Sequence, residues 1–264
     1  MKRKMKKKYR IVIAILIIAA AICCGIYIYE YYTAQKEIAG YTEIQSKYSS
    51  VAYGEITGWI EGGAASETDG LPYTLVAWDD LLTQNPQTVG WIAIPNSLIN
   101  YPVVQANDNS KYLRTSFIGE KSRTGTVFMD KDNNAEDLDQ NTVLYGHNMG
   151  SGRADMFGTL LYYKEQAHYD THRYVQFDTV YEQHGWWKVF AVINHDLSNG
   201  DFNYLRLQFG SEDEFMDWVA RAQALSMYDS DVEIKADDRI LILSTCDSAL
   251  FGKRGRLLIM AVKC

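Results

Sequence analysis

Hydrophobic and polar positions divide the first thirty residues into a basic stretch followed by an apolar one. Seven of residues 2–10 are basic, and residues 11–29 then carry no charge over 19 positions. A helix that crosses a membrane needs about 20 predominantly apolar residues, and its basic flank stays on the cytoplasmic side. The pattern predicts a cytoplasmic tail at 1–10, a transmembrane anchor at 11–29 and an extracellular remainder.

A cleaved signal peptide is the alternative interpretation of the same segment. Its apolar core is shorter, and a small-residue cleavage site follows it. Here the apolar run is followed by tyrosines, which gather at membrane–water interfaces, namely Tyr27, Tyr29, Tyr31 and Tyr32. The chain is therefore expected in the cell membrane as a single-pass protein, with its N-terminus cytoplasmic.

Beyond the apolar segment the hydrophobic positions form short alternating runs. Residues 30–70 are polar and predict an extracellular stalk with some helix at its start, and a folded domain is expected from 75 to 264. A short amphipathic helix is expected near 76–82, and two more helices near 156–163 and 211–227. Ser211 and Glu214 form a capping box at the start of the last one. Eight runs with strand character predict a mostly β barrel or sandwich: 90–94, 99–104, 125–129, 142–146, 174–178, 186–194, 239–245 and 256–262.

Charge and cysteine content narrow the functional classes. The net charge is −7, but when the seven basic residues of the tail are left out, the rest of the chain has 19 basic and 33 acidic residues. An acidic domain of this kind argues against nucleic acid as a partner. Cys23 and Cys24 lie in the apolar segment and Cys264 is terminal, so no disulfide framework is available. The isolated Cys246 is either a buried, inert thiol or a reactive nucleophile.

Three chemically active side chains stand at the ends of predicted strands. Cys246 closes the run at 239–245, His147 follows the run at 142–146, and Arg256 opens the last run. Side chains alternate along a strand, so Ser244 and Cys246 share a face, as do Tyr145 and His147. If these strands are neighbours, a thiol, an imidazole and a guanidinium converge. They would serve as nucleophile, acid/base and oxyanion stabiliser.

The residues around these positions resemble a sortase, and further matches indicate class B. The resemblance covers about residues 75–263 and rests on these motifs: Tyr145-Gly146-His147-Asn148, Ser244-Thr245-Cys246-Asp247, Arg256 before an apolar strand, Val89-Gly90-Trp91-Ile92, Tyr101-Pro102-Val103-Val104, Asp108-Asn109, Tyr112-Leu113 and Val127-Phe128-Met129-Asp130.

This resemblance implies a mostly β fold, an eight-stranded sortase-type β-barrel with a few helices. It also implies a membrane-anchored cysteine transpeptidase that cleaves the C-terminal sorting signal of surface proteins after Thr. The acyl group then passes from a Cys246 thioacyl-enzyme to a peptidoglycan amine. The expected partners are surface proteins with an Asn-Pro-x-Thr type signal, and no cofactor is expected.

The resemblance assigns catalysis to His147, Cys246 and Arg256, and substrate binding to Asn109, Leu113, Ser244 and Asp247. Each of the last four also has a structural interpretation: a turn for Asn109, core packing for Leu113, strand-end polarity for Ser244 and a cap for Asp247. Arg254 is the alternative to Arg256, but only Arg256 directly precedes the apolar strand.

Three other patterns are weaker. His168 and His172 have helical spacing, but no third ligand completes a metal set. The segment 130–134 begins like a calcium loop, but Ala135 stands where glycine is needed. Residues 85–88 read Asn-Pro-Gln-Thr, like a sorting signal, but no apolar segment and basic tail follow.

Two other functions remain open on the residues alone. One is a cysteine hydrolase of cell-wall peptides, although papain-like enzymes place cysteine before histidine and here the order is reversed. The other is a non-catalytic surface-binding β-barrel with an inert thiol.

Overall fold

The long helix α1 (Lys7–Tyr48) carries the apolar segment. The computed structural model describes residues 7–52, 68, 70–150, 155–181 and 184–264, which divide into two compact units, 1–43 and 44–264. In the first unit, apolar side chains are exposed on every side of α1. The helix is long and apolar enough to cross a membrane, so it is compatible with the expected anchor.

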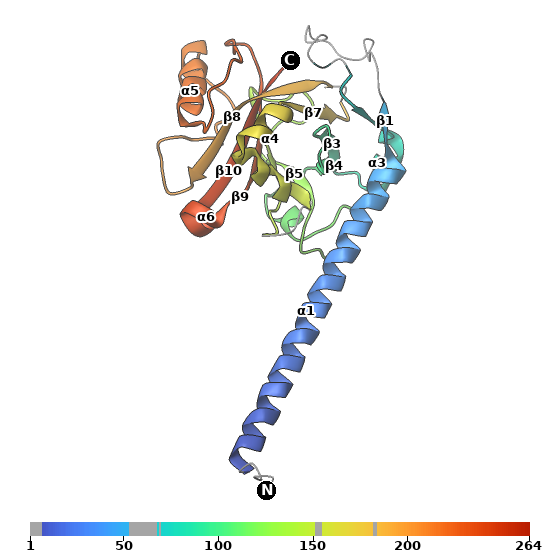
Figure 1. Ribbon diagram of the computed structural model, residues 1–264. Coiled ribbons are helices and arrows are strands. Elements are labelled where there is room, and N and C mark those ends of the chain that lie inside the picture. Colours follow the sequence, from blue (N-terminus) through green and yellow to red (C-terminus); the bar gives the residue numbers. More distant parts are fainter. Residues whose placement is uncertain (1–6, 53–67, 69, 151–154, 182–183) are drawn as a thin grey trace. The chain divides into compact units, whose positions relative to one another are not determined.

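The second unit is built on a closed barrel of eight strands in the order β10-β8-β7-β3-β4-β5-β6-β9 (Figure 1). Pairing is antiparallel except between β4 and β5 and between β6 and β9. The expected eight-stranded, mostly β fold is confirmed, with these strands: β3 (Thr88–Ala93), β4 (Asn100–Val104), β5 (Val127–Met129), β6 (Asn141–Tyr145), β7 (Tyr174–Thr179), β8 (Trp186–Asp196), β9 (Ile240–Cys246) and β10 (Gly255–Lys263).

Helix α5 (Glu212–Leu225) lies outside the barrel beside β8 (Figure 1). Its apolar stripe packs on Ile193 of β8 and Ile242 of β9 in one buried cluster; the stripe consists of Phe215, Trp218, Val219 and Ala222. The Ser211 hydroxyl accepts a hydrogen bond from the backbone N–H of Glu214, as the capping pattern predicts. This helix therefore covers the outer barrel face, on which the even-numbered residues of β9 lie.

A small hairpin-like pair precedes the barrel. Strand β1 (Ser49–Ala52) pairs with β2 (Tyr73–Val76), and β2 is attached to β7 by side chains. Gln176 accepts from the Thr74 N–H at 2.8 Å and donates to the Thr74 carbonyl at 2.7 Å. The Tyr73 hydroxyl donates to the buried carboxylate of Asp178 at 2.8 Å. The Gln176 amide thus takes the place of a strand partner for Thr74.

The remaining elements refine the expected boundaries. Helix α1 continues to Tyr48, and the second compact unit begins at Ile44. The Gly/Ala/Ser patch at 62–66 lies outside the described residues.

The other helical elements are short: α3 (Trp78–Gln84), η1 (Lys111–Leu113), η2 (Met156–Lys164), α4 (Gln166–Thr171), α6 (Ser248–Phe251) and η3 (Gly252–Arg254).

The attachment of β2 gives a stability prediction. Replacing Gln176→Met removes both hydrogen bonds to Thr74 and leaves two buried backbone groups unpaired, so we expect a loss of about 2–4 kcal/mol. The control Gln166→Met removes an exposed hydrogen bond to Asp170 and should change stability by no more than about 0.5 kcal/mol. Urea denaturation measures both, and equal losses would contradict the role of Gln176.

Candidate active site

The three strands that end in chemically active residues are neighbours in the barrel. Strand β9 pairs in parallel with β6, with Tyr145 opposite Ser244, and antiparallel with β10, with Arg256 opposite Cys246. Cross-strand neighbours point to the same face of a sheet. The register therefore puts the Cys246 and Arg256 side chains together on the outer face, as expected if the strands were adjacent.

Cys246 is the last residue of β9, and its thiol is free and exposed. Two hydrogen bonds tie this strand end to the loop that carries His147. The Thr245 hydroxyl donates to the Gly146 carbonyl at 2.8 Å, and the Asn148 amide donates to the Cys246 carbonyl at 2.8 Å. The residues on either side of His147 are thereby held against the end of β9.

His147 is half-buried, and one of its ring nitrogens is occupied. Nε2 lies 2.9 Å from the Leu113 carbonyl. Because a carbonyl oxygen only accepts, Nε2 carries a hydrogen, and Nδ1 is left to exchange protons. Burial lowers the pKa of His147, and Arg114 also lowers it, whereas the hydrogen bond to Leu113 raises it. The histidine is therefore oriented by a backbone group and is predominantly neutral near pH 7.

The two candidate arginines lie in different surroundings. Arg254 is exposed, and its Nε lies 3.4 Å from the Asp196 carboxylate. Arg256 is half-buried beside Cys246 and donates from one NH group to the carbonyls of Gly255 and Lys253 at 2.9 and 3.2 Å. Its other guanidinium donors remain for a ligand. The arrangement favours Arg256 as the oxyanion stabiliser.

Close backbone packing sets the position of Arg256. A Cβ atom on Gly255 would lie 1.9 Å from the Asp247 carbonyl oxygen, so only glycine fits there. Asp247 itself is buried: it accepts a hydrogen bond from the Ala249 N–H at the start of α6 and forms an ion pair with Lys164. The expected substrate-binding residue Asp247 thus holds the turn between β9 and β10, which is its capping interpretation.

The other expected substrate-binding residues, Asn109, Leu113 and Ser244, differ in what their polar groups contact. Asn109 donates to Asp130 at 2.9 Å and accepts from the Lys131 N–H at 2.8 Å, so its amide orders two loops. Leu113 contributes its carbonyl to His147, and its side chain is half-buried. The Ser244 hydroxyl is buried and forms no hydrogen bond with a described residue. Of the four, the Leu113 carbonyl contacts His147, Ser244 lies opposite Tyr145, and Asp247 directly follows Cys246.

Two tyrosines were not predicted as site residues. The Tyr145 hydroxyl donates to Asp130 at 2.7 Å. Burial raises the pKa of Tyr204, and Ser244 and Arg256 partly offset this increase, so its phenol lies near both. The face shared by Tyr145 and His147 could have indicated the first tyrosine. Tyr204 lies in the loop after β8, where the sequence has no periodic pattern.

No group of three histidine, cysteine or acidic side chains within the described ranges is arranged to hold a metal ion. The rings of His168 and His172 are stacked with centroids 3.8 Å apart. The Asp130 carboxylate receives hydrogen bonds from Asn109, Tyr145 and the Asp132 N–H.

Comparison with known proteins supports the same conclusion. The sortase domain matches residues 92–264. Sortase B of Listeria monocytogenes is 36% identical over 183 residues, covering 68% of this chain and 71% of that protein. Sortase B of Staphylococcus aureus is 28% identical over 256 residues, covering 97% and 96%.

Solved structures agree in fold. Sortase B from B. anthracis in complex with AAEK1 superposes with a TM-score of 0.68 at 31% identity, covering 89% of this chain and 98% of that one. The Staphylococcus aureus sortase B–substrate complex gives 0.65 at 32% identity, covering 71% and 84%.

A closed barrel with an exposed thiol opposite an arginine is the framework of a cysteine transpeptidase, and the chain belongs to the sortase family. Its relatives are sortases of class B. The expected family, class and enzyme type are confirmed. The comparisons do not support the two alternatives, a cysteine hydrolase of cell-wall peptides and a non-catalytic surface-binding module.

The exposed thiol gives a direct prediction. In a fragment of residues 30–264, iodoacetamide should modify Cys246 about tenfold faster than the half-buried Cys264. Peptide mapping by mass spectrometry measures both rates. A Cys246 that resists alkylation in the folded protein would be inert, contrary to its proposed role.

Proposed function

We propose that this sortase cleaves the C-terminal sorting signal of surface proteins after Thr and transfers the new acyl group to a peptidoglycan amine. The observation that supports this most is the pairing of Cys246 with Arg256 across β9 and β10, beside the loop that carries His147. The relatives support the reaction class, and one is a sortase B–substrate complex.

In the first half-reaction Nδ1 of the neutral His147 takes the proton of the Cys246 thiol, and the resulting thiolate attacks the carbonyl carbon of the Thr residue. Negative charge then develops on the carbonyl oxygen, and Arg256 donates hydrogen bonds to it without losing its own charge. His147 gives the proton from Nδ1 to the departing amine, and the C–N bond breaks. The products are a thioester on Cys246 and the released C-terminal fragment.

In the second half-reaction a primary amine attacks the thioester. His147 takes a proton from this amine, Arg256 again stabilises the oxyanion, and Cys246 leaves as a thiolate. The exposed position of Cys246 at a strand end allows both a protein substrate and a separate acceptor to approach. Splitting the exchange into two steps lets an amine compete with water.

The proposed location follows from the N-terminal residues. Seven basic side chains at 2–10 precede the uncharged apolar stretch 11–29, an arrangement that keeps the N-terminus in the cytoplasm and exports the catalytic unit. The substrates would be held at the same surface by their own membrane segments. The anchor then raises local concentration and takes no part in the chemistry.

The nucleophile can be tested by one substitution. Cys246→Ala should abolish cleavage of a fluorescence-quenched sorting peptide, while stability should change by no more than about 0.5 kcal/mol because the side chain is exposed. The matched control Cys264→Ala should cleave like the wild type. Near-normal cleavage by a folded Cys246→Ala protein would refute the mechanism.

The arginine assignment can be tested by paired substitutions. Arg256→Lys keeps a positive charge but loses the planar fork, so we expect kcat to fall about 10²-fold. Arg254→Lys should change kcat less than about twofold, since an exposed ion pair contributes little. If Arg254→Lys is the damaging change, the roles of the two arginines are reversed.

Substrate preference and anchoring can be tested together. A fragment of residues 30–264 retains the whole second unit and should cleave an Asn-Pro-x-Thr peptide as fast as the full chain. It should prefer this peptide to one of the Leu-Pro-x-Thr-Gly type. Equal cleavage of both peptides would contradict the proposed signal, and a folded but inactive fragment would contradict an anchor that only tethers.

A further inference from the structure

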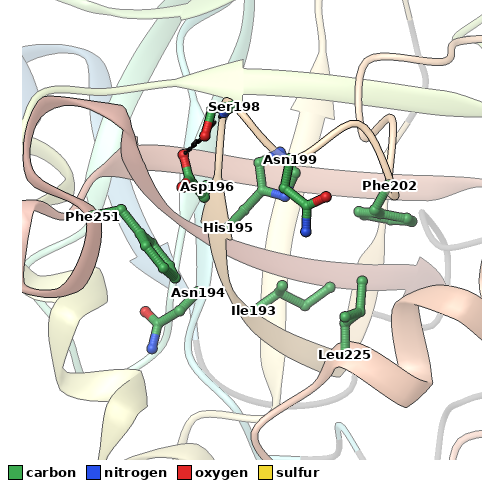
Figure 2. Close-up of a pocket in the computed structure, with 9 residues that line it drawn as sticks. All are labelled: Ile193, Asn194, His195, Asp196, Ser198, Asn199, Phe202, Leu225 and Phe251. Carbon is green, nitrogen blue, oxygen red and sulfur yellow. Dashed lines mark hydrogen bonds between the residues drawn. The ribbon is translucent and has the colours of Figure 1, made fainter.

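A hollow of about 440 Å³ lies at the end of β8, on the far side of Arg256 from Cys246. Its wall is formed by the end of β8, the segment after it, the end of α5 and the last residue of α6, as Figure 2 shows; the lining residues are Ile193, Asn194, His195, Asp196, Ser198, Asn199, Phe202, Leu225 and Phe251. None of the residues proposed above for catalysis lines it.

The register connects the hollow to the nucleophile. His195 pairs with Arg256 across β8 and β10, and Arg256 pairs with Cys246 across β10 and β9. Neighbouring Cα atoms across a ladder lie about 4.5–5.5 Å apart, so His195 is about 10 Å from Cys246 along one row on one face. A second wall residue, Phe251, belongs to α6, which begins two residues after Cys246. A ligand in the hollow would therefore lie close enough for a short peptide to reach a thioester on Cys246.

His195 is the strongest indication of a ligand. Its side chain is 7% exposed, and it lines the hollow. Its ring packs edge-on against Phe202 and Tyr204, with centroids 6.3 and 5.2 Å away. Burial lowers the pKa of His195, Arg256 lowers it further, and Asp196 raises it. The imidazole is therefore predominantly neutral near pH 7, and one ring nitrogen can accept a hydrogen bond.

The neighbouring polar groups also accept hydrogen bonds. Asn194 Oδ1 is buried without a partner among the described residues. Hydrogen bonds from Ser198 lower the pKa of Asp196, and Arg254 lowers it as well, so this carboxylate is charged. Among the residues that the structure describes, no lysine or arginine lines the hollow, and Arg254 lies 3.4 Å from the Asp196 carboxylate. A lining with a carboxylate oxygen, an amide oxygen and a neutral imidazole suits a ligand with N–H donors.

We propose that this hollow binds the acyl acceptor, a peptide with a primary amine, and that His195 accepts a hydrogen bond from it. The inference rests on the proposed transpeptidation and names the site for its second substrate. The sorting peptide and the acceptor would then approach the thioester from different sides of Arg256. Atoms are conserved as in the second half-reaction: the amine N–C bond forms, the C–S bond breaks, and His147 takes the proton.

The test compares the two products of one acyl-enzyme. With a sorting peptide and triglycine, a minimal peptide amine, the wild type should form both the transfer product and the hydrolysis product. His195→Phe keeps an aromatic ring against Phe202 and Tyr204 but removes the acceptor nitrogen. We expect the ratio of transfer to hydrolysis to fall about tenfold, with a higher KM for triglycine. This ratio does not depend on how fast the acyl-enzyme forms.

Two further variants sharpen the comparison. Asn194→Leu should also lower the ratio, and it provides an independent test if the phenylalanine disturbs packing. His168→Phe alters a histidine stacked on His172, outside the hollow, and should leave the ratio unchanged. An unchanged ratio in both His195→Phe and Asn194→Leu, or an equal fall in His168→Phe, would overturn the inference.

A binding measurement separates this inference from the proposed function. Triglycine titrated into the full chain carrying Cys246→Ala should bind, as followed by calorimetry, and His195→Phe in the same background should weaken binding about tenfold. Binding that depends on His195 without any wild-type cleavage would refute the proposed function alone. Cleavage by the wild type without such binding would refute the acceptor site alone.

Discussion

The pairing of β9 with β6 on one side and β10 on the other fixes where the reactive groups of this enzyme lie. The ladder sets Tyr145 opposite Ser244 and Arg256 opposite Cys246. A slip of one residue would move every side chain of a strand to the other face. The buried apolar positions resist such a slip, because Ile240, Ile242, Leu258 and Met260 pack under α5. The hydrophobic core thus determines which way the thiol and guanidinium point.

Backbone hydrogen bonds at the strand ends complete this arrangement. The Gly146 and Cys246 carbonyls accept from Thr245 and Asn148, and the Leu113 carbonyl holds the ring of His147. These bonds join three loops whose sequences are far apart. A nucleophile must remain exposed to reach two substrates, so its position depends on the backbone around it rather than on burial of its own side chain.

The same ladder extends from the proposed catalytic residues to the hollow on β8. Arg256 lies between Cys246 and His195 on this ladder, so its guanidinium donors stand between the thiol and the hydrogen-bond acceptors of the hollow. An acyl donor presents a carbonyl oxygen, whereas an acyl acceptor presents N–H groups. The distribution of donors and acceptors on the two sides of Arg256 therefore matches two chemically different substrates.

The sequence by itself determined the eight barrel strands and the capped helix α5, and it predicted a thiol, an imidazole and a guanidinium as the reactive groups. Each has a local signature, such as alternation along a strand or Ser211 three residues before Glu214. Only the tertiary structure decided that β6 and β9 are parallel neighbours. It also showed that the polar groups of Asn109 and Asp247 contact other residues of the protein. The structure also places Tyr204 near Arg256, and its second compact unit starts at Ile44. The reason is that these contacts join residues far apart in the chain, and such pairings leave no periodic pattern near either partner.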